Sequence, residues 1–182
     1  MKKAVLLVLS VWLMGSVALA AEFRVGIKGA LYTSEDSNFK DVYGSAMKLG
    51  LEGGVGIAKN LSAWAGVDYV HKTGKLLITE ETTTVSIIPL SLGLRYEVSA
   101  EEKFRVHMGA GVQMVFFKEE ASLGTASESG FGFMATAGAT YRVSPKIGVG
   151  LFVNWSTCSM THEDVEFKVG GLDIGVGIEF RL

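Results

Sequence analysis

Apolar residues alternate with polar or small ones along most of this chain. In the stretch IPLSLGLRYEV, residues 88–98, one face of an extended chain is entirely apolar: Ile88, Leu90, Leu92, Leu94, Tyr96 and Val98. The other face carries Pro89, Ser91, Gly93, Arg95 and Glu97. A period of two is typical of a β-strand whose two faces meet different surroundings. The alternation continues almost to the last residue, so it predicts an all-β fold.

The alternation predicts eight strands, which short and longer connections separate in turn. We place the strands at residues 22–32, 44–58, 61–72, 83–98, 103–117, 130–143, 146–156 and 166–182. The second, fourth and sixth connections are tight, whereas the others are longer and polar, as in DSNFKDV, TGKLLITEET, EEASLGTASES and TCSMTHED. Tight turns at one end and loops at the other indicate an antiparallel up-and-down meander.

The polar face of these strands is dominated by glycine. The chain has 23 glycines, and several alternate with charged residues, as Gly50, Glu52 and Gly54 do. Glycine weakens a strand that faces water, whereas small residues inside a narrow barrel leave room for a few long side chains. The glycine face therefore points inward and the apolar face outward. On this assignment Gly93→Ser should destabilise the barrel less than Leu92→Arg does.

An outward belt of Leu, Ile, Val and Met is tolerated only in hydrocarbon. A closed barrel satisfies every backbone polar group between strands, and the predicted strands reach the roughly 9 to 11 residues that a tilted span needs. Aromatic residues fall near strand ends, as interfacial girdles require: Phe23, Tyr69, Tyr96, Phe104, Tyr141, Trp155 and Phe180. We predict an eight-stranded antiparallel up-and-down transmembrane β-barrel. A soluble exported binding barrel is the alternative.

The first twenty residues have the features of a secretory signal peptide. Two lysines precede an apolar run, and Ala18-Leu19-Ala20 provides a small-x-small cleavage site. We therefore divide the chain into a signal peptide at 1–20 and a barrel domain at 21–182. Cleavage would remove two of the 17 basic residues and leave 15 against 19 acidic ones, which argues against a nucleic-acid partner. The single cysteine, Cys158, excludes an internal disulfide.

The chain resembles the small eight-stranded outer-membrane β-barrels, which include opacity-type and attachment-invasion adhesins and the membrane domain of outer-membrane protein A. The resemblance rests on the signal sequence, on IPLSLGLRYEV and on the last strand, LDIGVGIEFRL. It implies a monomer in the bacterial outer membrane, in contact with lipid and lipopolysaccharide and inserted by the barrel-assembly machinery. Gly177 and Phe180 match the C-terminal assembly signal of that family, whereas Leu182 stands where an aromatic residue is expected.

Three classes of function stay open. We favour a structural or surface-interaction role of the adhesion type, with an unidentified surface ligand, and keep a narrow channel for small solutes as the alternative. Some barrels of this fold modify lipid A with a His-x-Ser arrangement, but none of His71, His107 and His162 is followed by such a serine. We therefore predict no enzyme and no cofactor. Cys158 and His162 with their acidic neighbours fall short of a closed metal site, so we predict no metal.

Charged residues on the inward face predict an ion-pair network inside the barrel. Six of them lie several residues from the strand ends: Lys28, Glu52, Asp68, Arg95, His107 and Asp173. A charge removed from bulk water is costly unless it is paired, and eight strands leave an interior that side chains just fill. We therefore predict a lumen plugged by side chains, in which Trp64 and Phe152 occupy space that the glycines leave.

Deletion of residues 179–182 should block assembly. The shortened last strand could no longer pair fully with the first strand, so two sheet edges would stay open. We expect the truncated protein to accumulate in the periplasm or to be degraded, and Leu182→Phe to assemble at least as well as the wild type in an enteric host. Cell fractionation measures both outcomes. Wild-type surface levels of the truncated protein would contradict the assignment of the last strand.

Overall fold

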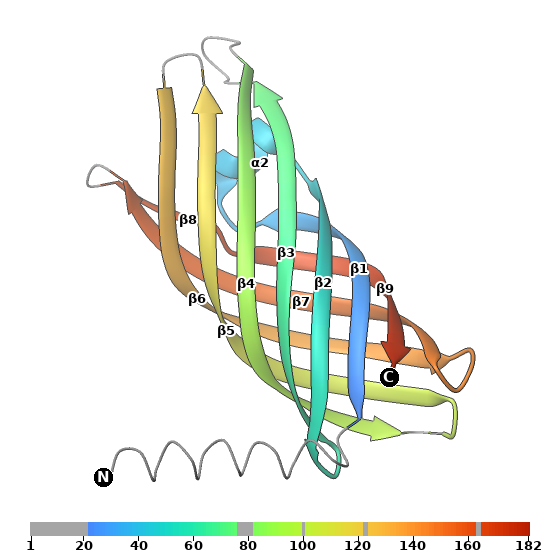
Figure 1. Ribbon diagram of the computed structural model, residues 1–182. Helices are drawn as coiled ribbons and strands as arrows, with labels where there is room; N and C mark the ends of the chain where they lie inside the picture. Colours follow the sequence, from blue (N-terminus) through green and yellow to red (C-terminus); the bar gives the residue numbers. More distant parts are fainter. Residues whose placement is uncertain (1–21, 76–81, 100, 122–123, 163–164) are drawn as a thin grey trace, which may run out of the picture.

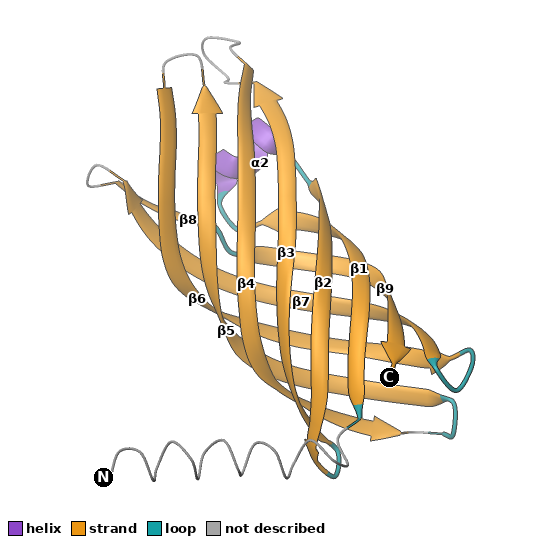
Figure 2. Ribbon diagram, viewed as in Figure 1, coloured by secondary structure: helices purple, strands orange, loops and turns teal. Residues whose placement is uncertain are grey.

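The protein folds into a closed antiparallel barrel (Figures 1 and 2). The structure, a computed structural model, describes residues 22–75, 82–99, 101–121, 124–162 and 165–182. The barrel strands are β1 (Phe23–Ser34), β2 (Ala46–Ala58), β3 (Leu61–Lys75), β4 (Thr82–Ser99), β5 (Phe104–Ala121), β6 (Gly124–Arg142), β7 (Ile147–His162) and β9 (Gly171–Arg181). Each strand pairs with the next, and β9 pairs with β1 to close the barrel. The predicted eight-stranded up-and-down barrel is confirmed.

The apolar face of the strands points outward, as the alternation predicted. Leu92 is 60% exposed, whereas Arg95, three residues further along the same strand, is 9% exposed. The outward face of β9 is equally apolar, with Ile174, Val176 and Ile178 all exposed. A belt of this kind around the whole barrel is the surface that a bilayer covers.

The first long connection contains a short helix, α2 (Ser37–Tyr43), which the alternation did not predict. Asp36 caps the helix, since its Oδ1 accepts a hydrogen bond from the Phe39 amide at 3.0 Å. Gly44 ends it at φ 62°, a region that favours glycine. Phe39, Val42 and Tyr43 share one face of the helix and pack against the apolar core of the barrel. Figure 2 shows the helix at the loop end. No helix in the described ranges has the length and apolarity to span a bilayer.

The strands at the loop end are longer than predicted. β5 and β6 continue through most of EEASLGTASES, and β7 continues through TCSMTH, although both stretches were predicted to be loops. Conversely, residues 166–182 do not form one strand. The short strand β8 (Val165–Lys168) pairs with the end of β7, and the barrel strand β9 begins at Gly171.

The longer strands reverse the polarity of their two faces toward the loop end. Beyond the row of Tyr69, Ile88 and Phe116, the outward positions carry polar groups: His71, Thr73, Thr84, Ser86, Lys118 and Ser127. The inward positions there form an apolar core that α2 covers: Tyr32, Ala46, Val70, Val85, Ile87, Val115, Phe117, Cys158, Met160 and Val169. This arrangement suits water, so the loop end projects beyond the hydrocarbon. The polar outward residues explain why composition alone indicated loops.

Gly93→Ser is not a mild substitution, contrary to the expectation from sequence, because the position has no room for a side chain. A Cβ at Gly93 would lie 2.4 Å from the Ala110 carbonyl oxygen and 2.9 Å from the Trp64 ring. A Cβ at Gly56, which also faces inward, would meet nothing within 4 Å. Gly56→Ser is therefore the proper inward comparison.

Leu92→Arg should destabilise the inserted barrel by about 2 to 4 kcal/mol, since it places a charge in hydrocarbon near the middle of the belt. Gly56→Ser should change the free energy of unfolding much less. Urea unfolding in lipid vesicles measures both variants. Equal costs for the two would contradict the assignment of the faces.

Candidate functional site in the barrel lumen

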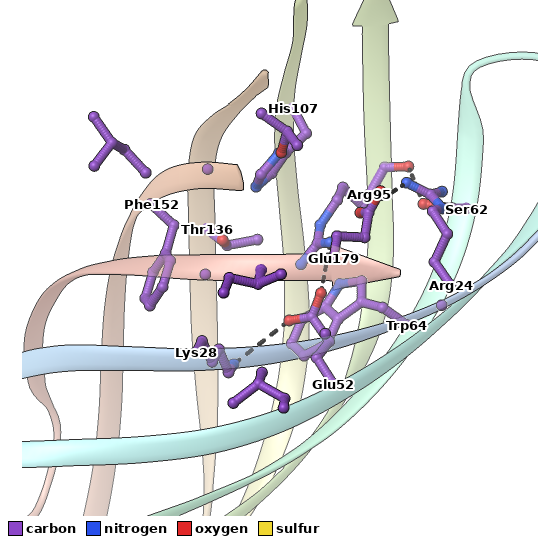
Figure 3. Close-up of a pocket in the computed structure, with 18 of the residues that line it drawn as sticks. Arg24, Lys28, Glu52, Ser62, Trp64, Arg95, His107, Thr136, Phe152 and Glu179 are labelled. Atoms are coloured by element: carbon purple, nitrogen blue, oxygen red, sulfur yellow. Dashed lines mark hydrogen bonds and ion pairs between the residues drawn. The ribbon is translucent and has the colours of Figure 1, made fainter. Parts of the chain in front are cut away.

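Ion pairs fill the middle of the lumen. Glu52 on β2 accepts from two cations: its Oε1 lies 2.6 Å from Arg95 Nη1, and its Oε2 lies 3.4 Å from Lys28 Nζ. Lys28 also lies 3.3 Å from Asp68 Oδ1. Gly50 provides the space, because a Cβ there would come within 3 Å of both the Lys28 and the Asp68 side chain. The structure thus joins four of the six predicted residues in one chain of ion pairs. Figure 3 shows Lys28, Glu52 and Arg95 of this chain.

The other two predicted residues, Asp173 and His107, lie apart from that chain of pairs. Asp173 Oδ2 is 2.7 Å from Lys48 Nζ, and both side chains are buried nearer the loop end. The Lys48 ammonium also lies 5.4 Å from the centre of the Tyr32 ring. His107 faces the lumen beside Gly138, where a Cβ would lie 2.7 Å from the imidazole. The six residues therefore form separate groups rather than one network.

A second network closes the short-turn end, and the sequence reasoning missed it. Arg24 Nη1 lies 2.8 Å from Glu97 Oε2, and Arg105 Nη2 donates to both carboxylate oxygens of Glu179 at 2.6 and 2.7 Å. Ser62 adds a hydrogen bond to Glu97 at 2.8 Å. All five side chains have inward parity in the sequence. The predicted network contained only charges that lie several residues from the strand ends, so it left these five out.

The apolar core closes the loop end. The Tyr43 hydroxyl of α2 donates to Glu119 and lies 3.0 Å from the Thr83 hydroxyl. Burial raises the pKa of Tyr43, so this hydroxyl stays protonated and holds the helix on the core. Cys158 is buried in the same core beside Met160. Within the described ranges, no three His, Cys, Asp or Glu side chains are grouped to hold a metal ion. The side chain of His162 and residues 163–164 lie outside the described part.

One histidine has a serine partner that its sequence neighbours did not reveal. His71 Nδ1 on β3 lies 3.1 Å from Ser86 Oγ on β4, because the strand register places the two residues opposite each other. The Tyr69 ring stacks on the imidazole at 6.1 Å. The pair is on the outer wall just beyond the apolar belt. It links two strands where the surface turns polar.

The predicted assembly-signal residues occupy the seam between β9 and β1. Gly177 is the register partner of Lys28, and Phe180 points outward. The Leu182 amide donates to the Phe23 carbonyl at 3.0 Å, while its side chain is 85% exposed. Recognition of these residues by an assembly machinery stays a prediction, as does cleavage after residue 20, since residues 1–21 lie outside the described ranges.

A cavity of about 80 Å³ separates the middle ion pairs from the network at the short-turn end. Its wall includes Arg24, Lys28, Arg95 and Trp64 (Figure 3). The Arg95 guanidinium lies 5.4 Å from the centre of the Trp64 ring, and Trp64 itself is 2% exposed. A smaller pocket of about 10 Å³ lies at the short-turn end, where Arg105, Arg142 and Glu179 line it.

Glu52→Gln should destabilise the barrel by about 2 to 3 kcal/mol, since it leaves buried Arg95 and Lys28 with less compensating charge. The matched control is Glu120→Gln, which breaks the exposed pair with Lys118 and should leave the free energy of unfolding unchanged within error. Urea titration in lipid vesicles, followed by gel mobility with and without boiling, measures both. Equal stability of the two variants would contradict the role of the buried pairs.

Comparison with known proteins agrees with the fold. Residues 4–180 match the family model described as the outer membrane protein beta-barrel domain. Among solved structures, Neisserial surface protein A is 14% identical with a TM-score of 0.66, covering 90% of this chain and 99% of that one. OprG from Pseudomonas aeruginosa is 15% identical with a TM-score of 0.68, covering 90% and 96%.

The attachment invasion locus protein of Yersinia pestis, solved with the heparin analogue sucrose octasulfate, is 11% identical with a TM-score of 0.55, covering 89% of this chain and 97% of that one. At these identities the likeness concerns the fold alone. Comparison with curated protein sequences gave no match. The family match covers nearly the whole chain, so the chain belongs to the outer membrane protein beta-barrel domain family and is a protein of the bacterial outer membrane.

Proposed function

We propose that the chain is a structural or surface-interaction barrel whose lumen passes no solute. The observation that carries this proposal is occlusion at two levels. Buried ion pairs around Glu52 fill the middle of the lumen, and the apolar core around Val85 and Val115, both 0% exposed, fills the loop end. A solute would have to separate buried ion pairs and then pass a packed core, and both steps are costly.

A narrow channel is the second candidate, and the cavity beside Trp64 favours it. The cavity gives part of the path that a small solute would need. It stops below the pair of Lys48 and Asp173, however, and the core that Tyr43 and α2 cover lies beyond that pair. We therefore place the channel second.

The loop end supports a surface role. Its described strands project beyond the apolar belt around a core of their own, so they present outward side chains at fixed positions on the sheet. The attachment invasion locus protein was solved with a sulfated heparin analogue. The first loop of this chain carries Glu35, Asp36 and Asp41, which would repel such a polyanion. A neutral or cationic surface ligand fits this loop better.

The belt is expected to contact lipopolysaccharide in the outer leaflet, and the last strand is expected to be read by the barrel-assembly machinery. We propose a monomer, because the strand pairing of β1 with β9 closes the sheet without a second copy. We propose no enzymatic activity, since the pair of His71 and Ser86 is exposed on the outer wall rather than held in a cleft.

Planar-bilayer recording tests the closed lumen. The refolded wild type should give no stable conductance, while a sixteen-stranded porin recorded in parallel conducts. Glu52→Ala and Tyr43→Ala should each stay silent as well, because each variant weakens only one of the two barriers. A reproducible wild-type conductance would overturn the proposal and favour the channel.

A further inference from the structure

The barrel wall is split between β6 and β7 toward the loop end. The pairing of the two strands stops at Gly132 and Cys158, although β6 starts at Gly124 and β7 continues to His162. The end of β7 pairs instead with β8. Figure 1 shows the upper part of β6 rising away from β7 and β8. Among the described strands, residues 125–129 of β6 therefore pair with β5 alone.

Alternate residues of β6 direct their backbone groups toward this split. At the turn end of β6, the Arg142 amide donates to the Lys103 carbonyl, next to β5, at 2.7 Å. The Val143 amide donates instead to the Ile147 carbonyl of β7 at 2.9 Å. Even-numbered residues of β6 therefore face β5 and odd-numbered ones face β7, because the register with β5 runs without a shift along the strand. The odd-numbered residues from 125 to 129 thus direct their amides and carbonyls into the split.

This open edge lies in water and lacks the usual protection. It begins at Ser129, the register partner of Phe116 at the end of the apolar belt, and runs away from the belt. Sheets usually protect such an edge with Lys, Pro, a bulge or a very short strand. β8 follows that rule, since it has four residues and ends in Lys168. The stretch TASES at 125–129 has no Lys, no Pro and no register shift. Its one charge, Glu128, would repel an acidic segment but not a neutral or basic one.

The two faces beside the split differ in polarity. On the inner side, an added Cβ at Gly130 would lie 2.9 Å from Met160 Cγ, and Phe167 is partly buried against the same apolar core. On the outer side, Thr125 and Ser127 are exposed. A strand added to β6 would therefore meet apolar side chains on one face and water on the other. Alternating polar and apolar residues suit such a strand.

We propose that the open edge of β6 at residues 125–129 binds an extended segment of a partner protein, which adds to the sheet as a strand with alternating polar and apolar residues. Pairing at the odd-numbered residues would form about six hydrogen bonds, one amide and one carbonyl from each residue. The proposal rests on the surface-interaction role proposed above and names the kind of partner.

A second copy of this chain fits the edge less well. Two barrels in one membrane have strands that run in the same direction, so their β6 edges could pair only in parallel. That arrangement would join the outer face of one sheet to the inner face of the other. The polar outer face of one copy would then continue into the apolar core side of its partner. The segment that binds is therefore part of a different polypeptide.

Fluorescence anisotropy of a labelled peptide tests the proposal. The probe has the sequence KTVTVTVTK, and the matched control carries an N-methyl group on every threonine. With threonine outward and valine inward, the threonine amides face β6, so methylation blocks the hydrogen bonds and keeps the side chains. Each peptide is titrated with the refolded barrel in a nonionic detergent, with empty micelles as the blank. The probe should bind saturably, and the methylated peptide about tenfold more weakly.

Two substitutions at one residue separate the backbone from the side chain. Ser127→Pro removes an amide that points into the split and leaves the bonds to β5 in place, so it should weaken probe binding about tenfold. Ser127→Ala removes only the hydroxyl and should bind the probe like the wild type. Gel mobility before boiling verifies that both variants are folded. If Ser127→Pro fails to fold, the two peptides still decide the outcome.

Equal binding of the two peptides, equal binding by the two Ser127 variants, or no saturable binding of the probe would each overturn the proposal. A wild type that dimerises where Ser127→Pro stays monomeric would assign the edge to a second copy and overturn it as well. A silent barrel that fails to bind the probe would overturn this proposal alone. A conducting barrel that binds the probe would refute only the closed lumen.

Discussion

Hydrogen bonding of the backbone in a medium without water is the constraint on which this structure depends. The seam between β1 and β9 meets it by pairing residues from Arg24 with Arg181 through Ser34 with Gly171. Once this seam closes, every barrel strand has two neighbours, and hydrocarbon can surround the sheet. Eight strands enclose an interior that side chains can just fill, and inward charges such as Glu52 and Arg95 pair with one another there. The glycines and ion pairs of the lumen follow from that narrowness.

The two faces of each strand meet different surroundings, and these surroundings change along the strand. Within the belt, apolar groups such as Leu92 point to lipid, while charges such as Arg95 are paired inside. Toward the loop end the assignment reverses, because water replaces lipid outside and the interior can be apolar. Val85 and Val115 then build a core of the ordinary soluble kind, which α2 covers. One sheet therefore carries a membrane part and a soluble part without a linker between them.

The alternation predicted a strand correctly where its apolar residues stayed on one face along the whole strand. Alternation identified every barrel strand, the outward belt and the inward parity of Lys28, Glu52, Asp68 and Arg95. It failed where polarity reversed: the Ser and Thr residues near 125–129 indicated a loop although they continue β6. The alternation also could not predict which charges pair across the lumen, since barrel curvature and strand stagger decide that Asp173 meets Lys48. The helix signal at Asp36, Phe39, Val42 and Tyr43 was present but was hidden by the β pattern on both sides.

Quenching of single tryptophans by lipids with brominated acyl chains tests the assignment of the faces most directly. Leu151 and Phe152 are neighbours on β7; Leu151 is 67% exposed, and Phe152 lines the cavity. Each can be replaced by tryptophan in a chain whose three native tryptophans are changed to phenylalanine. The structure predicts strong quenching for Leu151→Trp and almost none for Phe152→Trp. Equal quenching of the two, or the reverse order, would show that lipid and lumen have been assigned to the wrong faces.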